Sequence, residues 1–115
     1  MTPPTIDTAT FDELKATAGA DFAVELVDTF LTEAPLMIAE LRRAFAAGDA
    51  DTFRRTAHSL KSNGNTFGAH TFATMAKALE LGGMAPVRTE GGAPLDALDS
   101  EYARVARTLT ELKGG

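Results

Sequence analysis

Hydrophobic residues recur every three or four positions along most of the chain, which is the spacing of side chains on one face of an α-helix. The most regular stripe lies near the C-terminus and consists of Leu95, Leu98, Tyr102, Val105, Leu109 and Leu112. An earlier stripe consists of Phe53, Ala57, Leu60, Gly64 and Phe67. No segment shows the alternation of apolar and polar residues that marks a half-buried strand. The pattern therefore predicts an all-α fold.

Glycines and a proline divide the stripes into separate helices. Gly19, Gly48 and Gly68 each follow the end of a stripe, where glycine commonly ends a helix. Gly82 ends a further stripe, and Pro94 suits the first turn of the last helix because its backbone angle is fixed. The connections are short, so consecutive long helices are expected to run antiparallel.

The stripe that contains Gly64 crosses a poor helical sequence, because Asn and Gly favour turns. We expect the helix to continue to Thr66 nevertheless, since Phe67 keeps the apolar spacing. The glycine would then allow close packing against a neighbouring helix.

The N-terminal part of the chain is expected to form a short helix and then a long one. Residues 1–9 form an extended lead, and Thr10 and Glu13 have the spacing of a capping box at a helix N-terminus. The next stripe begins at Phe22. It contains Pro35, which lacks a backbone donor and so predicts either a kink or two consecutive helices.

Residues 82–94 contain four glycines and two prolines without apolar periodicity, so they are expected to form a flexible loop. The chain of 115 residues has the size of a single domain, residues 1–115. The predicted architecture is an antiparallel four-helix bundle with a short N-terminal accessory helix.

Composition and charge exclude several classes of protein. The 11 Lys and Arg residues are outnumbered by 16 Asp and Glu residues, and the net charge of −5 argues against nucleic-acid binding. Because there is no cysteine, disulfide scaffolds, thiolate metal sites and cysteine nucleophiles are excluded. No apolar run is long enough to cross a membrane, and the first residues lack the pattern of a signal peptide. We therefore expect a small, acidic, cytoplasmic domain.

One histidine lies in a locally basic part of this acidic chain. On a helical wheel, His58 points about 140° away from the apolar stripe of its helix, toward solvent or a partner surface. Its neighbours at helical spacing include Arg54, Arg55 and Lys61, and residues 52–71 contain no acidic residue. A neutral imidazole is a good nucleophile near pH 7, and these cations could stabilise a phosphoryl group that it accepts.

The chain from His58 to Ala69 reads His-Ser-Leu-Lys-Ser-Asn-Gly-Asn-Thr-Phe-Gly-Ala. This stretch resembles the signature of histidine-containing phosphotransfer (HPt) domains: His-x-Leu-Lys-Gly, four variable residues, an apolar residue and Gly-Ala. Ser62 departs from the commonest residue of that signature, glycine, but it is also small. The resemblance covers residues 22–81.

The resemblance implies a role for each matching residue. His58 would be the phosphoacceptor, Lys61 the cation beside the phosphoryl group, and Ser62 a small residue that leaves the ring accessible. The partners would be response-regulator receiver domains and a hybrid sensor histidine kinase. The family implies a monomeric phosphocarrier without kinase or phosphatase activity, and the alanine-rich composition favours a bacterial source. It would hold no cofactor or metal of its own, because Mg²⁺ belongs to the receiver.

One further residue can be placed by counting along the chain. If the break at Gly68 joins two antiparallel helices, His58 lies eleven residues before Ala69 and Glu80 lies eleven residues after it. The two side chains would then be level, because the rise per residue is the same in both helices. Glu80 could accept a hydrogen bond from one ring nitrogen of His58 and leave the other free to attack phosphorus.

Three alternatives remain open. A helical adaptor could dock on a receiver domain and sequester it without carrying phosphate. A sensor-kinase dimerisation domain typically has an acid directly after its histidine and a proline four residues later, but this chain has Ser59 and Asn63 there. A purely structural bundle would not explain the basic cluster. No metal site is expected, because His58 and His70 lack the spacing of helical metal ligands and no third ligand is evident.

Overall fold

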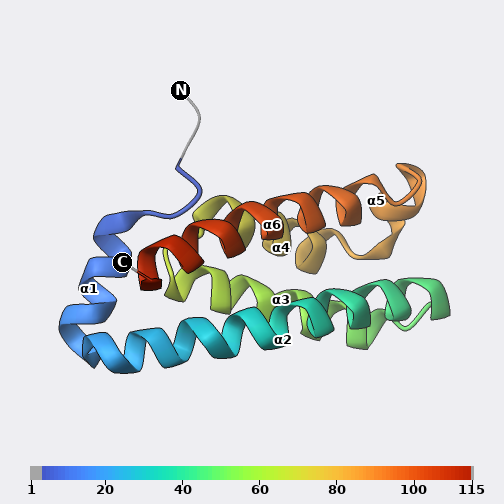
Figure 1. Ribbon diagram of the computed structural model, residues 1–115. Coiled ribbons are helices and arrows are strands. Elements are labelled where there is room, and N and C mark those ends of the chain that lie inside the picture. The colour runs from blue at the N-terminus through green and yellow to red at the C-terminus, as the bar shows by residue number, and fades with distance from the viewer. Residues whose placement is uncertain (1–3, 115) are drawn as a thin grey trace.

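The structure is a computed structural model that describes residues 4–114, and six helices and no strand lie in this range (Figure 1). The predicted all-α fold is confirmed. The helices are α1 (Thr8–Ala18), α2 (Ala20–Ala47), α3 (Ala50–Thr66), α4 (His70–Gly82), α5 (Met84–Thr89) and α6 (Ala93–Gly114).

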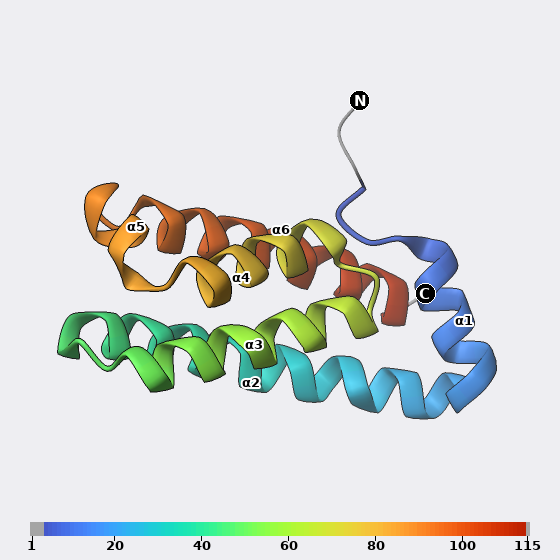
Figure 2. The same ribbon diagram turned by 180° about the vertical axis from the view of Figure 1, so that it is seen from behind.

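Four of the helices form the bundle. Helix α3 packs against α2 and α4, and α6 packs against α2 and α4 on the other side, so the four helices enclose one core. Helix α1 lies across one end of the bundle, and α5 lies at the opposite end, as the two opposite views show (Figure 1, Figure 2). The predicted four-helix bundle with an N-terminal accessory helix is therefore confirmed.

Aromatic rings join three of the bundle helices inside the core. The ring centroid of Phe30 in α2 lies 6.2 Å from that of Phe72 in α4 and 5.9 Å from that of Tyr102 in α6. Phe67, which follows α3, packs 5.3 Å from Phe30. Tilted and edge-on ring contacts of this kind add to the stabilisation from apolar burial alone. The core thus fixes α3 and α4 relative to the rest of the bundle.

A glycine allows α3 and α4 to approach closely. Gly64 is buried, and a Cβ atom built there would lie 2.9 Å from the Phe72 ring and 3.3 Å from the Cβ of Ala73. The continuation of α3 through Gly64 is therefore confirmed. Gly68 makes the turn with a φ of +80°, and its carbonyl accepts a hydrogen bond of 2.8 Å from the backbone N–H of Asp7.

The predicted start of α1 is wrong by one turn. Asp7 is the N-cap, because its carboxylate accepts a hydrogen bond from the backbone N–H of Ala9, at 3.1 Å. Thr10 lies inside the helix, and its hydroxyl donates to Asp7. The extended lead is accordingly shorter than residues 1–9, and its first three residues lie outside the described range. The cap is a local contact of a favoured N-cap residue, and the backbone N–H of Asp7 also anchors this end of the helix to the α3–α4 turn.

Helix α2 continues through Pro35 as one helix, so one of the two predicted outcomes, two consecutive helices, does not occur. The proline leaves the carbonyl of Leu31 without its backbone donor. The hydroxyl of Tyr102 donates to this carbonyl at 3.3 Å and replaces the missing partner. The start of the stripe is also different from the prediction. Phe22 is 50% exposed, and the smaller Ala23 faces the core in its place.

The prediction of a loop at residues 82–94 is wrong. Helix α4 extends to Gly82, a short helix α5 follows, and α6 begins at Ala93. Val87 is almost fully buried and ties α5 to the core. A single buried valine gives no apolar periodicity from which a helix could be predicted. The glycines on both sides favour a loop instead.

Candidate functional site

Helix α3 presents His58 on its outer face. Asp49 caps this helix and accepts a hydrogen bond from the backbone N–H of Thr52 at 3.1 Å. The apolar stripe is turned into the core, with Ala57 and Leu60 on either side of His58 fully buried. The His58 side chain is consequently 54% exposed, as the helical wheel predicts.

Glu80 lies between His58 and Lys61. Its Oε2 atom is 2.8 Å from Nδ1 of His58, and its Oε1 atom is 3.1 Å from Nζ of Lys61. The predicted proximity of Glu80 and His58 is therefore confirmed. The exposed fraction of the Glu80 side chain is only 14%. The carboxylate is therefore mostly covered by protein, whereas the His58 ring is accessible to solvent.

The charges of the cluster fix the tautomer of the ring. The Lys61 ammonium, and after it the His58 ring, hold the pKa of the Glu80 carboxyl below its usual value. An ionised carboxylate only accepts hydrogen bonds, so Nδ1 of His58 is the donor. Among the described residues, no hydrogen bond or ion pair involves Nε2 of His58. In the neutral imidazole this nitrogen carries the lone pair.

The arginines near His58 are less free than the sequence indicates. Asp51 lies one turn earlier in α3, and its carboxylate contacts Arg54 at 3.2 Å and Arg55 at 3.0 Å. With Glu80 beside Lys61, each of the three cations has an acidic partner. The absence of acids from residues 52–71 therefore does not leave the three cations without acidic partners in the folded protein. Two carboxylates partly offset the three cations, and a partner would have to compete with Asp51 for the arginines.

A shallow hollow of about 350 Å³ adjoins the ring. It is lined by Arg54, Arg55, His58, Ser59 and Glu80. Ser62 is exposed one turn further along α3, and among the described residues its hydroxyl takes part in no hydrogen bond. Small side chains beside the ring leave room for another protein to reach Nε2.

The second histidine lies away from this site. His70 begins α4, and its Nε2 atom is 3.5 Å from the carboxylate of Asp7 at the accessory helix. In residues 4–114, no three His, Cys, Asp or Glu side chains are arranged to hold a metal ion. Within the same range, no helix combines the length and the apolar character that a bilayer crossing requires.

A family model described as "Hpt domain" matches residues 25–113, which include His58, Lys61 and Glu80. The chain belongs to the HPt family. The crystal structure of histidine-containing phosphotransfer protein B (HptB) from Pseudomonas aeruginosa PAO1 is similar to the whole HPt chain, with a TM-score of 0.88 and 26% sequence identity. The match covers 98% of this chain and 97% of that one. A search of curated proteins found no significant match.

Two features of this HPt domain are not evident from its motif. Asp51 pairs with both arginines, and it lies one residue before the acid-free stretch of the sequence. A groove between α2 and α3 also opens beside the histidine. The spacing of three and four residues between Asp51 and the arginines could have revealed the first feature. The groove depends on tertiary packing, and the local sequence does not indicate it.

Proposed function

We propose that this HPt domain carries a phosphoryl group on His58 and relays it between the aspartates of receiver domains. The observation that carries the proposal is the arrangement of one half-exposed imidazole, whose Nδ1 is held by Glu80 while Nε2 is unpaired among the described residues. Membership in the family supports a phosphorelay role, and a hybrid sensor histidine kinase is the expected source of phosphate.

The transfer step forms one bond and breaks another. The lone pair of Nε2 attacks the phosphorus of a receiver phosphoaspartate, and the bond between phosphorus and the aspartate oxygen breaks. The aspartate leaves as a carboxylate, and the ring becomes positively charged. Its Nδ1 proton stays in place, because Glu80 holds it before and after the transfer. Transfer to a second receiver reverses these events.

Glu80 and Lys61 have complementary roles in this proposal. The Glu80 carboxylate orients the ring and stabilises its positive charge as phosphorus binds. The Lys61 ammonium is close to the same carboxylate and can turn toward the oxygens of the phosphoryl group. Neither residue needs to exchange a proton, so we classify both as positioning and electrostatic residues.

The partner supplies the rest of the chemistry. Because the receiver brings the aspartyl phosphate and Mg²⁺, we expect this chain to have no bound cofactor and no kinase or phosphatase activity alone. Ser62 is expected to serve through its small size. The domain is expected to be a monomer in the cytoplasm.

The experiment mixes the protein with a phosphorylated receiver domain and examines the labelled adduct. A phosphohistidine is labile in acid and stable in base, so the wild-type adduct should show this behaviour. His58→Gln should abolish labelling while the helical circular dichroism remains unchanged, because the side chain is exposed. His70→Gln is the matched control and should be labelled like the wild type.

The result also decides between the two candidate functions. Labelling of His58→Gln at the wild-type rate would contradict the assignment of the phosphoacceptor. Stable binding of the receiver without any labelling of the wild type would instead support the adaptor, which sequesters a receiver without carrying phosphate.

A further inference from the structure

Asp51 lies about two turns before His58 in α3, and two arginines lie between them. Each oxygen of its carboxylate contacts one arginine: Oδ1 is 3.2 Å from Nη2 of Arg54, and Oδ2 is 3.0 Å from Nε of Arg55. Residues spaced by three and four positions are neighbours on a helix surface, so one carboxylate can hold both side chains. Among the described residues, no other acid lies within ion-pair distance of either arginine.

The same two arginines are also neighbours of the histidine. Arg54 lies four residues before His58 and Arg55 three, so they are as close to the ring along the helix as they are to Asp51. Both line the hollow of about 350 Å³ that contains the ring. Their side chains are 56% and 65% exposed, so little packing restrains them. Each guanidinium can therefore turn from Asp51 toward a group carried on Nε2.

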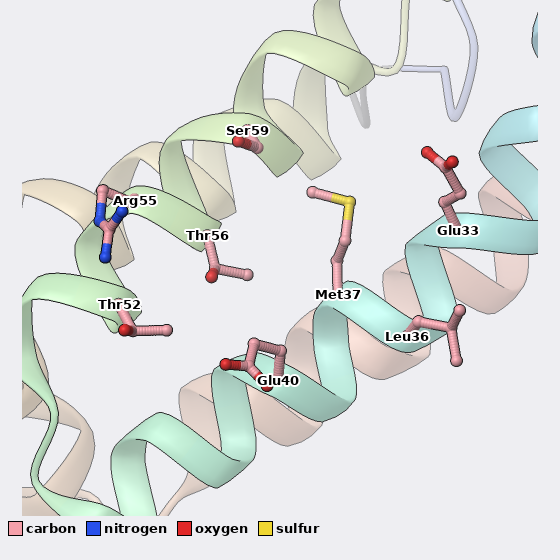
Figure 3. A pocket seen from close by; sticks show the side chains of 8 residues that line it. All are labelled: Glu33, Leu36, Met37, Glu40, Thr52, Arg55, Thr56 and Ser59. Atoms are coloured by element: carbon pink, nitrogen blue, oxygen red, sulfur yellow. The ribbon is translucent and has the colours of Figure 1, made fainter.

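The other nearby acids are already engaged. Arg55 borders the groove of about 610 Å³ between α2 and α3, and Glu40 lies on the opposite wall of that groove (Figure 3). The carboxylate of Glu40 is paired with Arg43. Glu80, the acid of the hollow, contacts two basic side chains of its own. Asp51 is thus the acid that holds the two arginines in the unphosphorylated domain.

A phosphoryl group on Nε2 would change the balance between these contacts. It adds nearly two negative charges and three acceptor oxygens, which guanidinium groups bind in bidentate fashion. Exposed ion pairs within one helix are weak, so the contacts of Asp51 can break. The helix rises about 10 Å between Asp51 and His58, which is close to the screening length in 0.1 M salt, so direct repulsion is small. Asp51 can therefore influence the phosphoryl group mainly through the arginines.

From this arrangement we propose that Asp51 is a positioning residue that competes with the phosphoryl group for Arg54 and Arg55. Its carboxylate holds both arginines in the unphosphorylated domain, and they turn to the phosphoryl oxygens after transfer. The loss of the contacts with Asp51 offsets part of the stabilisation that the arginines provide. Asp51 thereby keeps the phosphoryl group transferable and sets the position of the transfer equilibrium. The inference rests on the proposed phosphotransfer function.

The first measurement is the equilibrium constant for transfer from a phosphorylated receiver to the protein. Only the unbound proteins enter this constant, so it does not depend on how tightly they dock. Asp51→Asn should raise it about threefold, because phosphorylation no longer has to break two ion pairs, and the gain should shrink at high salt. Asp96→Asn is the matched control and should have no effect, since this aspartate lies in the first turn of α6 and is paired with Arg42.

A combined variant tests whether Asp51 acts through the arginines. Arg54→Gln together with Arg55→Gln should lower the equilibrium constant about fivefold, because two cations beside the phosphoryl group are lost. Adding Asp51→Asn to this double variant should change the constant no further, because no arginine is left to compete for. Circular dichroism verifies that each variant keeps its helices.

A spectroscopic measurement follows the arginines without any receiver. The donor is phosphoramidate: Nε2 of His58 attacks phosphorus, the phosphorus–nitrogen bond of the donor breaks, and ammonia leaves from the protonated nitrogen. ¹H–¹⁵N NMR should show that the side-chain Nε–H signals of Arg54 and Arg55 shift when the phosphoryl group is added. The signal of Arg104, which is paired with Glu101 in α6, is the control and should not move.

Each failure has a distinct meaning. If neither donor labels the wild type, the proposed function itself is wrong. If the wild type is labelled but Asp51→Asn does not raise the equilibrium constant, the inference is overturned while phosphotransfer stands. A rise that persists in the double arginine variant would also overturn it, because Asp51 would then act on the phosphoryl group directly. Arginine signals that stay in place on phosphorylation would overturn it as well.

Discussion

Two pairs of helices in this bundle carry ion pairs, but the arrangements differ. Between α2 and α6, Arg42 contacts both Asp96 and Asp99, and Lys113 contacts Asp28. These contacts connect two helices and involve no group with a free reactive atom. Between α3 and α4, the carboxylate of Glu80 contacts two basic side chains of α3, the ammonium of Lys61 and the imidazole of His58.

The difference lies in what each cluster leaves unused. In the α2–α6 pair, the charged side chains are satisfied by one another, so the contacts can only position helices. In the α3–α4 pair, Glu80 occupies Nδ1 of His58 and leaves Nε2 available on a half-exposed ring. A cluster of charges therefore indicates chemistry when it restrains a nucleophile without covering its reactive atom.

The largest effect is expected from separating α3 and α4. Gly64→Val would drive a side chain into Phe72, which lies 2.9 Å from the position of a Cβ. The free energy of unfolding should fall by about 3 kcal/mol, as expected for overpacking a tight core. Urea unfolding measures this loss. Asn65→Val is the matched control, because this neighbouring residue is exposed and the two residue types have similar helix propensities. Equal stability of the two variants would contradict the close approach of the helices.

A smaller effect should follow from removing the carboxylate of the α3–α4 cluster. Glu80→Ala should slow phosphate acceptance from a receiver by about tenfold or more, because the ring loses its orienting acceptor. Glu80→Gln should be intermediate, since its amide oxygen can still accept from Nδ1 while the negative charge is lost. Single-turnover transfer measures both rates. Acceptance at the wild-type rate by a folded Glu80→Ala would remove this residue from the mechanism.

The α2–α6 pair should respond in the opposite way. Arg42→Ala removes the contacts with Asp96 and Asp99, but these side chains are considerably exposed and screened by solvent. The free energy of unfolding should therefore fall by only about 0.5 kcal/mol. Transfer to His58 should be unchanged. A large loss of transfer by a folded Arg42→Ala variant would show that the α2–α6 ion pairs influence the reactivity of His58, and it would contradict this prediction.

The smallest effect is a dependence of stability on pH. The pKa of Glu80 is lowered in the folded protein from the usual value of 4.5, mainly by Lys61 and then by His58. Its stabilising contribution is therefore present above pH 4.5 and is lost as the pH falls through the folded pKa. The difference in urea midpoint between the wild type and Glu80→Gln should be measurable at pH 7 and smaller at pH 3. A difference that does not change with pH would contradict the ionic nature of the contact.

The sequence alone predicts the positions of those site residues that lie on regular helices. His58 and Lys61 are one turn apart in α3, and their outward direction follows from the apolar stripe alone. The level position of Glu80 follows from equal rise on both sides of a tight turn. The glycine at position 68 made that count reliable, because the turn occupies so few residues.

Other features could not be read from local patterns because distant residues decide them. The anchoring of the N-terminal segment depends on the hydrogen bond from the backbone N–H of Asp7 to the carbonyl of Gly68, a distant part of the sequence. In α2, Tyr102 from α6 supplies the donor that Pro35 lacks. Helix α5 depends on one buried residue, Val87. In each case tertiary contact overrides the local preference of the chain.

The central claim is that Nε2 of His58 is the atom that accepts phosphate while Nδ1 stays bonded to Glu80. ¹⁵N NMR of the protein labelled at histidine, recorded before and after phosphorylation by a receiver, tests this claim most directly. The account predicts that the unmodified ring carries its proton on Nδ1, and that coupling to phosphorus then develops at Nε2. Coupling to phosphorus at Nδ1 of His58, or at His70, would contradict it.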